Sequence, residues 1–131
     1  MEKVVVRAII LNDKGEVLLA KRASGFGVNQ WAFVGGKPKN GEELENAIKR
    51  EVREELGLEL YKVKLYRKEI DKLSVTGEIW SVYFFTSRFK GNIVIKKDEL
   101  KDVKFVIKKD LKTLDIAFDH KERLLEFFET L

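Results

Sequence analysis

Three glutamates occupy unusual positions in Glu42–Leu56, a segment with the periodicity of an α-helix. Glu51 and Glu55 fall inside the apolar stripe of this predicted helix, and Glu54 lies at its edge. The segment therefore turns three carboxylates toward the protein interior, where packing favours apolar side chains. At about 100° per residue, the stripe comprises Leu44, Ala47, Ile48, Val52 and Leu56.

This placement is unfavourable unless another charge compensates it. Burying an unpaired carboxylate costs several kcal/mol, and Glu51 and Glu55 repel each other as an i,i+4 pair. Both also lie near the helix C-terminus, where the helix dipole disfavours negative charge. Carboxylates clustered without His or Cys select a hard divalent cation such as Mg²⁺, Mn²⁺ or Ca²⁺. The helix thus predicts a metal site, and the alternative is a set of surface ion pairs such as Arg50 with Glu54.

The rest of the chain predicts the elements that position this helix. No linker, repeat or low-complexity tract interrupts the sequence, which predicts a single domain over residues 1–131. Strands precede and follow the helix and a second helix comes last, which indicates an α+β domain with a mixed sheet and helices on both faces. The predicted strands are Val4–Leu11, Val17–Lys21, Trp31–Val34, Leu60–Ile70, Glu78–Arg88, Asn92–Ile95 and Val103–Ile107, and the last helix spans Lys121–Leu131.

The connections between these elements carry further predictions. The turn residues Asn12–Gly15 predict a hairpin of the first two strands, and the polar stretch Asp71–Gly77 joins the two longest strands. Asp119 is the expected N-cap of the last helix, with Glu122 completing a capping box. His120, the only histidine, fits the first turn of that helix.

The composition limits the class of protein. Charged residues make up 37% of the chain, against about a quarter in an average protein, with one methionine. This excess of Lys and Glu is typical of proteins from thermophiles. The absence of cysteine excludes a disulfide framework and a thiolate metal site. No signal peptide and no apolar stretch of roughly 20 residues is present, so we expect a cytoplasmic, soluble protein.

The charge of the chain bears on its partners. A net charge of +4 and a pI near 9.2 favour a polyanionic ligand. The lysines are spread along the chain without interleaved aromatic residues, which favours a phosphate-bearing small molecule over nucleic acid or a membrane. The pairs Phe84–Phe85 and Phe127–Phe128 serve either a homodimer contact or the core.

The segment Gly36–Leu58 resembles the Nudix box, the signature of the Nudix hydrolases. That pattern is Gly, five residues, Glu, seven residues, then Arg-Glu-apolar-x-Glu-Glu-x-Gly-apolar, and every fixed position matches. The upstream and downstream strands are also similar to the family, so the resemblance covers nearly the whole chain. It implies an α/β/α sandwich and Mg²⁺-dependent cleavage of a phosphoanhydride bond. The matching residues are Gly36, Glu42, Arg50, Glu51, Val52, Glu54, Glu55, Gly57 and Leu58.

The resemblance also implies roles for the acidic residues of the box. Glu51, Glu54 and Glu55 are the implied ligands of roughly two or three Mg²⁺ (or Mn²⁺) ions. Glu54 or Glu51 is in addition the candidate base. Arg50 is implied to pair with Glu42 and to fix the orientation of the ligand carboxylates.

Two further ligands are implied outside the helix. The backbone carbonyl of Gly36 resembles the loop ligand of the family, and Gly35 lets the chain turn there. An acid from a distal loop completes the site in many members. Glu99 or Asp98 fits that role, with Glu78 a weaker candidate, and an ordinary charged loop is the alternative for each.

The residues expected to contact substrate lie on both sides of the box. Arg22 is either a phosphate contact or a surface charge at a strand end. Phe26, Trp31 and Phe33 are candidates for stacking on a nucleobase, and core packing is the alternative for each. Asp119 lies in a segment, residues 117–120, that is similar to ADP-ribose pyrophosphatase-like Nudix domains.

These features rank ADP-ribose or a similar nucleoside diphosphate-linked substrate first. A (d)NTP, converted to the monophosphate and pyrophosphate, ranks second, because Gly25–Gly27 followed by Trp31–Phe33 resembles triphosphate-cleaning members. A third hypothesis is a nucleotide-binding regulator without turnover, against which the intact carboxylate set argues. Val34 stands where family members usually carry Pro, which alters the stiffness of the loop before Gly35.

Overall fold

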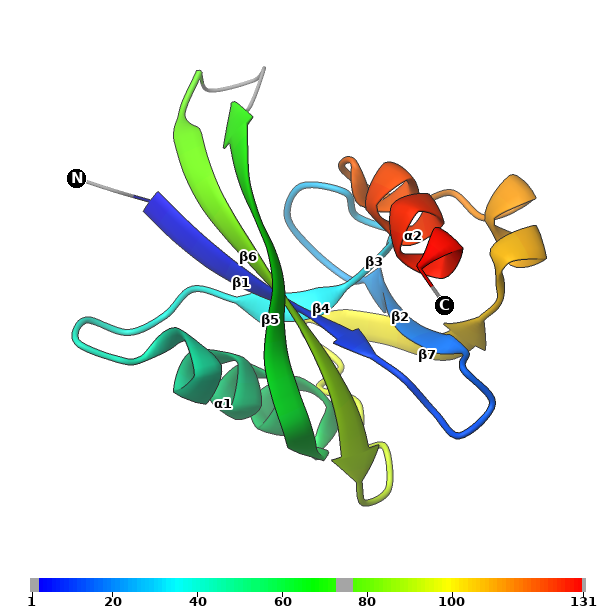
Figure 1. Cartoon of the computed structure of the whole chain (residues 1–131), viewed down its shortest axis with the longest axis horizontal. Coiled ribbons are helices and arrows are strands. Elements are labelled where there is room, and N and C mark those ends of the chain that lie inside the picture. The colour runs from blue at the N-terminus through cyan, green and yellow to red at the C-terminus, as the bar shows by residue number, and fades with distance from the viewer. Residues whose placement is uncertain (1–2, 73–76, 131) are drawn as a thin grey trace.

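The computed structural model describes residues 3–72 and 77–130. Figure 1 shows two α-helices placed on different sides of a set of crossing strands. In chain order the elements are β1 (Lys3–Ile10), β2 (Val17–Arg22), β3 (Trp31–Ala32), β4 (Val34–Gly36), α1 (Leu44–Leu56), β5 (Glu59–Lys72), β6 (Ile79–Lys90), β7 (Leu100–Val106), the 3₁₀ helix η1 (Lys108–Lys112) and α2 (His120–Glu129).

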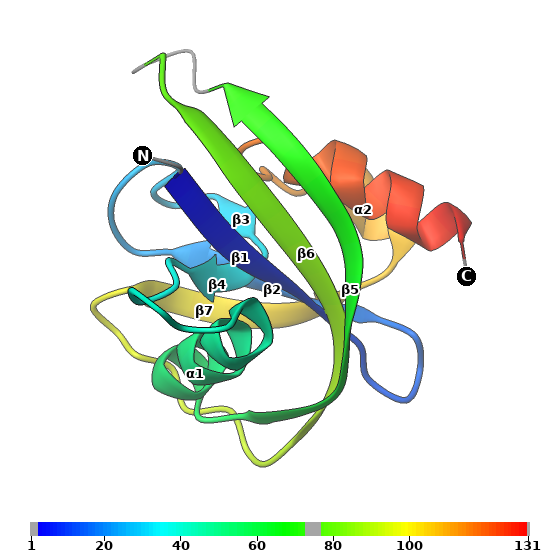
Figure 2. The same cartoon turned by 60° about the vertical axis from the view of Figure 1, so that its left-hand side comes forward.

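The strands form two sheets that cross one another (Figure 2). The four-stranded sheet has the order β4-β1-β6-β5, and the three-stranded sheet has the order β3-β2-β7. The first sheet is mixed, because β1 runs parallel to β6 and antiparallel to β4. The predicted turn at Asn12–Gly15 forms and a bridge pairs Leu11 with Val17, but the predicted hairpin is wrong, because β1 and β2 lie in different sheets. Both edges of β1 are already occupied, so β2 pairs with β3 and β7 instead.

Alternating side chains of β1 enter two separate apolar clusters. Val6, Ala8 and Ile10 belong to the cluster that contains Ile48 of α1. Ile9 belongs to the cluster that contains Leu124 of α2 and the aromatic residues around it. Both faces of the strand are therefore covered, as expected for a strand of β-branched residues without polar alternation. The predicted α+β sandwich with a mixed sheet is confirmed.

The predicted strand Trp31–Val34 is divided between the two sheets. Trp31 and Ala32 pair with β2, whereas Val34 and the two glycines after it pair with β1. Phe33 lies between the two short strands and is 1% exposed. One continuous segment thus links the sheets and brings Gly36 beside the Glu51 side chain of α1.

The predicted strand Asn92–Ile95 is wrong. This segment has no strand structure, but its backbone caps α1. The N–H of Val94 donates to the Leu56 carbonyl at 2.8 Å, and the N–H of Lys96 donates to the Glu55 carbonyl at 2.9 Å. The last carbonyls of a helix have no hydrogen-bond partner within the helix. Here they accept hydrogen bonds from the backbone of this extended segment, which therefore does not pair with a strand.

The first helix begins at Leu44, two residues later than expected from Glu42. The Glu42 side chain instead accepts a hydrogen bond from the Lys39 N–H at 2.9 Å. The helix ends at Gly57, as predicted, which has a φ of 69° and donates its N–H to the Arg53 carbonyl. A left-handed residue at this position favours glycine because it has no Cβ.

Asp119 is the N-cap residue of α2, but its side chain makes no capping hydrogen bond, so the predicted capping box with Glu122 is wrong. Its carboxylate lies 3.6 Å from Nε of Arg123. This carboxylate therefore forms an i,i+4 ion pair with Arg123 and does not bind a backbone N–H at the start of α2.

Other predictions concern surface and core. Phe84, Phe85 and Phe127 are buried within the single chain, and Phe128 packs partly buried against the same core as Phe84 and Phe127, so all four contribute to the core. The predicted connection Asp71–Gly77 lies partly outside the described residues. Among the residues that are described, no helix is long and apolar enough to span a membrane.

Candidate active site

A cleft of about 330 Å³ opens beside the segment that links the two sheets. Its lining includes the two glycines of β4, residues of the second half of β2 and the first residue of β7. Five charged residues line it: Glu55 and Glu99 as the acids, and Arg7, Arg22 and Lys37 as the cations. Acidic and basic groups in one hollow fit a ligand that carries both metal ions and phosphates.

Arg50 holds the carboxylates next to this cleft. Its Nε and Nη2 donate to the two carboxylate oxygens of Glu42 at 2.8 and 3.0 Å. Its Nη1 donates to Glu51 and to Glu54, each at 3.1 Å, and Nη2 reaches the Lys37 carbonyl at 3.2 Å. The hydrogen bonds from Arg50 lower the pKa of Glu42 to about 2. One planar guanidinium therefore fixes three carboxylates, the orienting role that the sequence resemblance implied.

The two glycines of the loop are required by close approach. A Cβ atom at Gly36 would lie 2.4 Å from the carboxyl carbon of Glu51, and a Cβ at Gly35 would lie 1.9 Å from the Val6 carbonyl oxygen. Any side chain at Gly36 would displace the Glu51 carboxylate. The backbone of the loop and this carboxylate thus lie side by side, where both can contact one ion.

We call Glu51, Glu55 and Glu99 the acid wall. Glu55 is 7% exposed, and burial raises its pKa to about 8, helped by the negative charges of Glu51 and Glu99. Burial also raises the pKa of Glu51, against the opposing effect of Arg50. Glu99 is held at this wall by the backbone, since its carbonyl accepts the Ala23 N–H at 2.9 Å. Burial and neighbouring negative charge disfavour the ionised forms of Glu51 and Glu55, and a bound cation would compensate these charges.

The chemistry of this donor set fits Mg²⁺ or Mn²⁺, with Gly36, Glu51, Glu54, Glu55 and Glu99 as the residues that would hold it. Within residues 3–72 and 77–130, no three acidic or histidine side chains converge into a ready-made ion cage. Mg²⁺ does not need one, because it keeps several waters and shares its coordination between one or two carboxylates and substrate phosphates. Glu54 is the most exposed of the set, with 48% of its side chain accessible.

Asp98 and Glu78, the alternative distal acids, lie elsewhere. Asp98 is absent from the cleft lining, and Glu78 forms an ion pair with Lys3 at the start of β1. Glu99 lines the cleft and also pairs with Lys96 at 3.2 Å. Of the three candidates, the structure brings Glu99 alone to the acid wall.

The residues expected to contact substrate separate into two groups. Arg22 and Phe33 line the cleft, although Phe33 is almost fully buried. Phe26 is 59% exposed outside the lining, and its carbonyl accepts a hydrogen bond from Nε of Arg22 at 2.7 Å. Trp31 is packed in the core that surrounds α2. Asp119 lies outside the lining and faces Arg123.

Two residues at this site were not singled out from the sequence. Arg7 lies opposite Gly35 in the β1–β4 ladder and lines the cleft. Phe118 is 44% exposed, and the guanidinium carbons of Arg7 and Arg22 lie 5.7 and 5.3 Å from its ring centroid. Arg7 could have been recognised from the sequence, because it is a charged residue within the apolar run of β1. Phe118 belongs to residues 117–120, the segment that is similar to ADP-ribose pyrophosphatase-like members, but its ring was not singled out as a contact.

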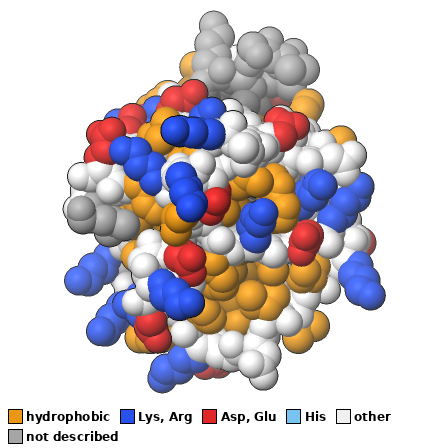
Figure 3. Space-filling model, turned by 90° about the vertical axis from the view of Figure 1, so that its right-hand side faces the viewer, with side chains coloured by type: hydrophobic (Ala, Val, Ile, Leu, Met, Phe, Trp, Pro, Cys, Tyr) orange, Lys and Arg blue, Asp and Glu red, His pale blue; other side chains and the backbone are white. Residues whose placement is uncertain are grey.

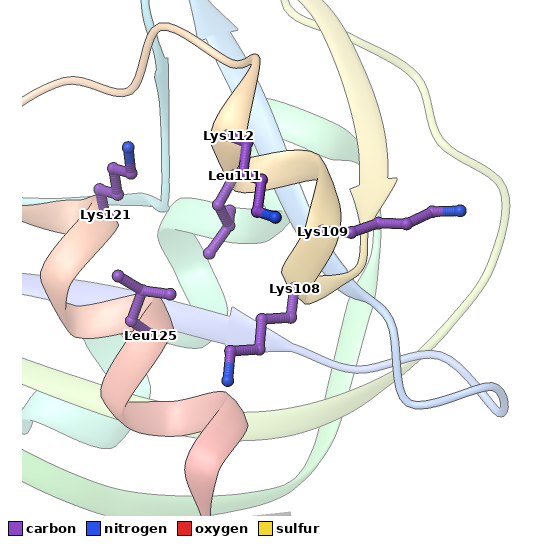
Figure 4. Close-up of a pocket in the computed structure, with 6 residues that line it drawn as sticks. All are labelled: Lys108, Lys109, Leu111, Lys112, Lys121 and Leu125. Carbon is purple, nitrogen blue, oxygen red and sulfur yellow. The ribbon is translucent and has the colours of Figure 1, made fainter.

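A second hollow, of about 430 Å³, lies between η1 and α2 (Figure 4). It is lined by Leu111 and Leu125 together with Lys108, Lys109, Lys112 and Lys121. Seen from this side, apolar side chains are exposed between lysines and arginines (Figure 3). Lys109 points away from the two leucines (Figure 4). This hollow is the larger one, but no carboxylate lines it, so it lacks the groups that metal-dependent chemistry needs.

The fold and the site together define a hydrolase of the class that acts on phosphoanhydrides. The NUDIX domain model matches residues 1–127, and the chain belongs to the Nudix family. The nucleoside triphosphatase NudI of Enterobacter sp. (strain 638) is 36% identical over an alignment of 126 positions, which covers 88% of this chain and 89% of that protein.

Solved structures agree with this assignment. The MutT Nudix hydrolase from Burkholderia pseudomallei superposes with a TM-score of 0.86 at 26% identity, covering 95% of this chain and 97% of that one. The Nudix domain of Shewanella oneidensis NrtR, in complex with ADP ribose, gives a TM-score of 0.84 at 19% identity, covering 99% of this chain and 88% of that one. The second likeness, at this low identity, shows the fold alone.

Proposed function

We propose that the chain hydrolyses a nucleoside triphosphate to the nucleoside monophosphate and pyrophosphate, with Mg²⁺ or Mn²⁺ as cofactor. The similarity to a nucleoside triphosphatase over most of both chains carries this proposal. ADP-ribose ranked first from the sequence, and this similarity reverses that order. The substrate is a small nucleotide in either case.

The site residues support an in-line displacement by water. The ions, when bound, supply positive charge that neutralises the phosphate oxygens. Glu54 or Glu51 orients a water molecule and accepts its proton as the water oxygen attacks phosphorus. The bond from that phosphorus to the bridging oxygen breaks, and the leaving phosphate takes the electron pair. Arg50 keeps both carboxylates in position through its hydrogen bonds at 3.1 Å.

ADP-ribose remains the second candidate. The observation in its favour is Asp119 in residues 117–120, the segment that is similar to ADP-ribose pyrophosphatase-like members. The side chain that would serve such a substrate is half-buried and faces Arg123. Cleavage of ADP-ribose would give AMP and ribose phosphate, so its products distinguish it from a triphosphate.

A panel of substrates tests the proposal. We would incubate the purified chain and Mg²⁺ with (d)NTPs, 8-oxo-dGTP, ADP-ribose, other nucleotide sugars and diadenosine polyphosphates, and identify products by mass spectrometry. We expect monophosphate and pyrophosphate from a triphosphate to be the fastest reaction. Fastest release of AMP and ribose phosphate from ADP-ribose would replace this proposal with the second candidate.

The variant Glu54→Gln is the control for turnover. We expect it to lose activity while its circular dichroism spectrum stays unchanged. If nothing in the panel is turned over and a nucleotide still binds, the chain is a regulator that uses the Nudix fold without catalysis.

A further inference from the structure

The segment before α2 pairs with β3 through a short parallel bridge. The N–H of Trp31 donates to the Asp115 carbonyl, and the N–H of Ala117 donates to the Trp31 carbonyl, both at 2.8 Å. If this ladder continued, the next donor would be the Phe33 N–H and its acceptor would be the Ala117 carbonyl. The partners that these two groups actually take show what the end of the chain does for the site.

The chain turns away from β3 at Phe118, before that next bond forms. Phe118 has a φ of 58°, in the left-handed region that a bulky residue rarely adopts. The Ala117 carbonyl accepts the N–H of His120 at 3.2 Å, in the first turn of α2. The Phe33 N–H donates to Nδ1 of His120 at 3.1 Å. The side chain of His120 thus takes the place of the backbone acceptor that the turn removes.

The surroundings of His120 keep its ring in the neutral form that can accept a hydrogen bond. The residue is 3% exposed, and its ring centroid lies 4.8 Å from that of Phe33 and 5.1 Å from that of Phe118. Burial, and then the charges of nearby arginines, lower the pKa of His120 well below 6.5. A neutral imidazole has one protonated nitrogen and one acceptor nitrogen. The bond from Phe33 requires that the acceptor be Nδ1.

The residues that follow Phe33 contact two carboxylates of the acid wall. Phe33 itself lies between β3 and β4, outside both of their ladders. The Gly35 backbone donates a hydrogen bond to the Glu55 carboxylate. Gly36 is so close to Glu51 that an added Cβ would lie 2.4 Å from its carboxyl carbon. A shift of this short segment would therefore disturb both carboxylates.

We propose that His120 is a positioning residue of the hydrolytic site, which anchors the crossing between the two sheets at the Phe33 N–H and thereby holds Glu51 and Glu55 in place. This inference rests on the proposed function and deepens it. A buried donor without an acceptor is unfavourable, so loss of Nδ1 would shift the segment toward another partner. Such a shift would misplace carboxylates that hold the ions, and would lower both kcat and the affinity for metal.

His120→Leu and His120→Asn separate the acceptor from the volume of the side chain. Leu removes the acceptor and keeps an apolar side chain, whereas the side-chain oxygen of Asn can replace Nδ1. For the best triphosphate, we expect His120→Leu to lower kcat about 10- to 100-fold and to change KM less than about 3-fold. We expect kcat of His120→Asn to stay within about 3-fold of the wild type.

Phe127→Leu is the matched control for packing. Phe127 is 4% exposed in the same core around α2, and it packs edge-on against Tyr66 of β5. We expect this variant to lower Tm and to leave kcat unchanged. If His120→Leu lowers Tm in the same way with unchanged kcat, His120 serves packing only and the inference is wrong.

Two measurements on the chain without nucleotide test the position of the segment directly. Amide hydrogen exchange in the metal-free chain should be faster at Phe33 and Gly35 in His120→Leu, beyond any general increase that Phe127→Leu shows. Titration with Mn²⁺, followed by electron paramagnetic resonance, should show about 10-fold weaker binding in His120→Leu. His120→Asn should resemble the wild type in both. Equal losses in the Leu and Asn variants would overturn the role of the acceptor.

The wild-type ring supplies a test that does not depend on the folding of any variant. The nitrogen NMR shifts of His120 near neutral pH should show an unprotonated Nδ1 and a protonated Nε2, and a protonated Nδ1 would overturn the inference. If the exchange and Mn²⁺ results hold but no nucleoside triphosphate is hydrolysed, the proposed function fails and the positioning role stands. If wild type and His120→Leu hydrolyse triphosphates equally well, the positioning role alone fails.

Discussion

The acid wall and the group of Arg7, Arg22 and Phe118, which we call the arginine end, are built in different ways. The acid wall draws Glu51 and Glu55 from one helix, and a capping segment of backbone brings Glu99 to them. The arginine end draws Arg7, Arg22 and Phe118 from two strands in different sheets and from the segment before α2. The first is a local construction, and the second exists only when the two sheets and the second helix are all in place.

This difference indicates how the substrate preference of such a site can change. Within the acid wall, Glu51 lies too close to Gly36 to leave room for a side chain there, and it accepts a hydrogen bond from Arg50, which also holds Glu42 and Glu54. Single changes at these residues are therefore expected to disturb several carboxylates together. The arginine end comes from other segments of the chain and acts on Glu55 through the charges of Arg7 and Arg22. Changes at Arg7 or Phe118 are therefore expected to alter KM and substrate choice, whereas changes in the acid wall lower kcat.

The largest effect is expected for Glu55→Gln at the acid wall. Loss of a ligand carboxylate should lower kcat by roughly 10²-fold or more, because the ions neutralise charge in the transition state. The metal-free variant should be as stable as the wild type or more stable, because Glu55 is a carboxylate that is 7% exposed. Thermal unfolding with and without Mg²⁺ checks both points: the wild type gains Tm with Mg²⁺, and the variant does not.

Glu45→Gln is the matched control, because Glu45 lies on the exposed side of the same helix and pairs loosely with Lys49 at 3.9 Å. It should retain activity and the Mg²⁺-dependent shift in Tm. A Glu55→Gln variant with full activity would remove Glu55 from the ligand set. A clear loss of stability without metal would show that this carboxylate is satisfied by the protein alone.

A smaller effect is expected for Gly36→Ala, which tests the contact between loop and helix. The new Cβ would lie 2.4 Å from the carboxyl carbon of Glu51, so the loop or the carboxylate must move. We expect a destabilisation of about 1–3 kcal/mol in urea unfolding, together with a loss of activity. The double variant with Glu51→Ala removes the collision, so the cost of Gly36→Ala should fall by about 1 kcal/mol or more. Additive effects of the two changes would contradict this account.

The contrast between the two ends also shows what the sequence was able to predict. Glu51, Glu54 and Glu55 were recognised because a helix repeats every 3.6 residues or so, and a short window contains the whole pattern. The pairing of Arg7 with Phe118 depends on contacts between distant segments, which no local period records. The same reason explains the wrong hairpin, since Asn12–Gly15 is a sound turn whose two strands enter different sheets.

The segment Asn92–Ile95 illustrates a second limit. Its β-branched residues favour a strand. Its backbone N–H groups instead donate hydrogen bonds to the carbonyls at the end of α1, which have no partner within the helix. The division of Trp31–Val34 has a related cause, because Gly35 approaches the Val6 carbonyl more closely than any residue with a side chain would permit. In both places tertiary contacts, and not local preference, decided the structure.

The smallest expected effect concerns the protonation of His120, which lies between the arginine end and the core. Its Nδ1 accepts a hydrogen bond from the Phe33 N–H at 3.1 Å, so the folded protein holds the ring neutral. Burial, and then the charges of Arg7, Arg22 and Arg123, lower the pKa of His120 well below 6.5. The unfolded chain binds a proton at this histidine below pH 6.5 and the folded chain does not. Stability from this group is therefore complete above pH 6.5 and is lost progressively as the pH falls toward the folded pKa.

His120→Asn isolates this contribution, because the amide oxygen of Asn can accept the same hydrogen bond and does not titrate. The difference in unfolding free energy between wild type and variant should change by up to about 1.4 kcal/mol per pH unit below pH 6.5, and stay constant above it. In Arg7→Met the pKa of His120 in the folded protein should rise. The pH range in which this histidine changes the stability should therefore end at a higher lower limit. Urea unfolding from pH 5 to 8 measures both. A flat difference curve would mean that His120 is protonated alike in the folded and unfolded chain, and that the two arginines exert no field on the ring beside Phe118.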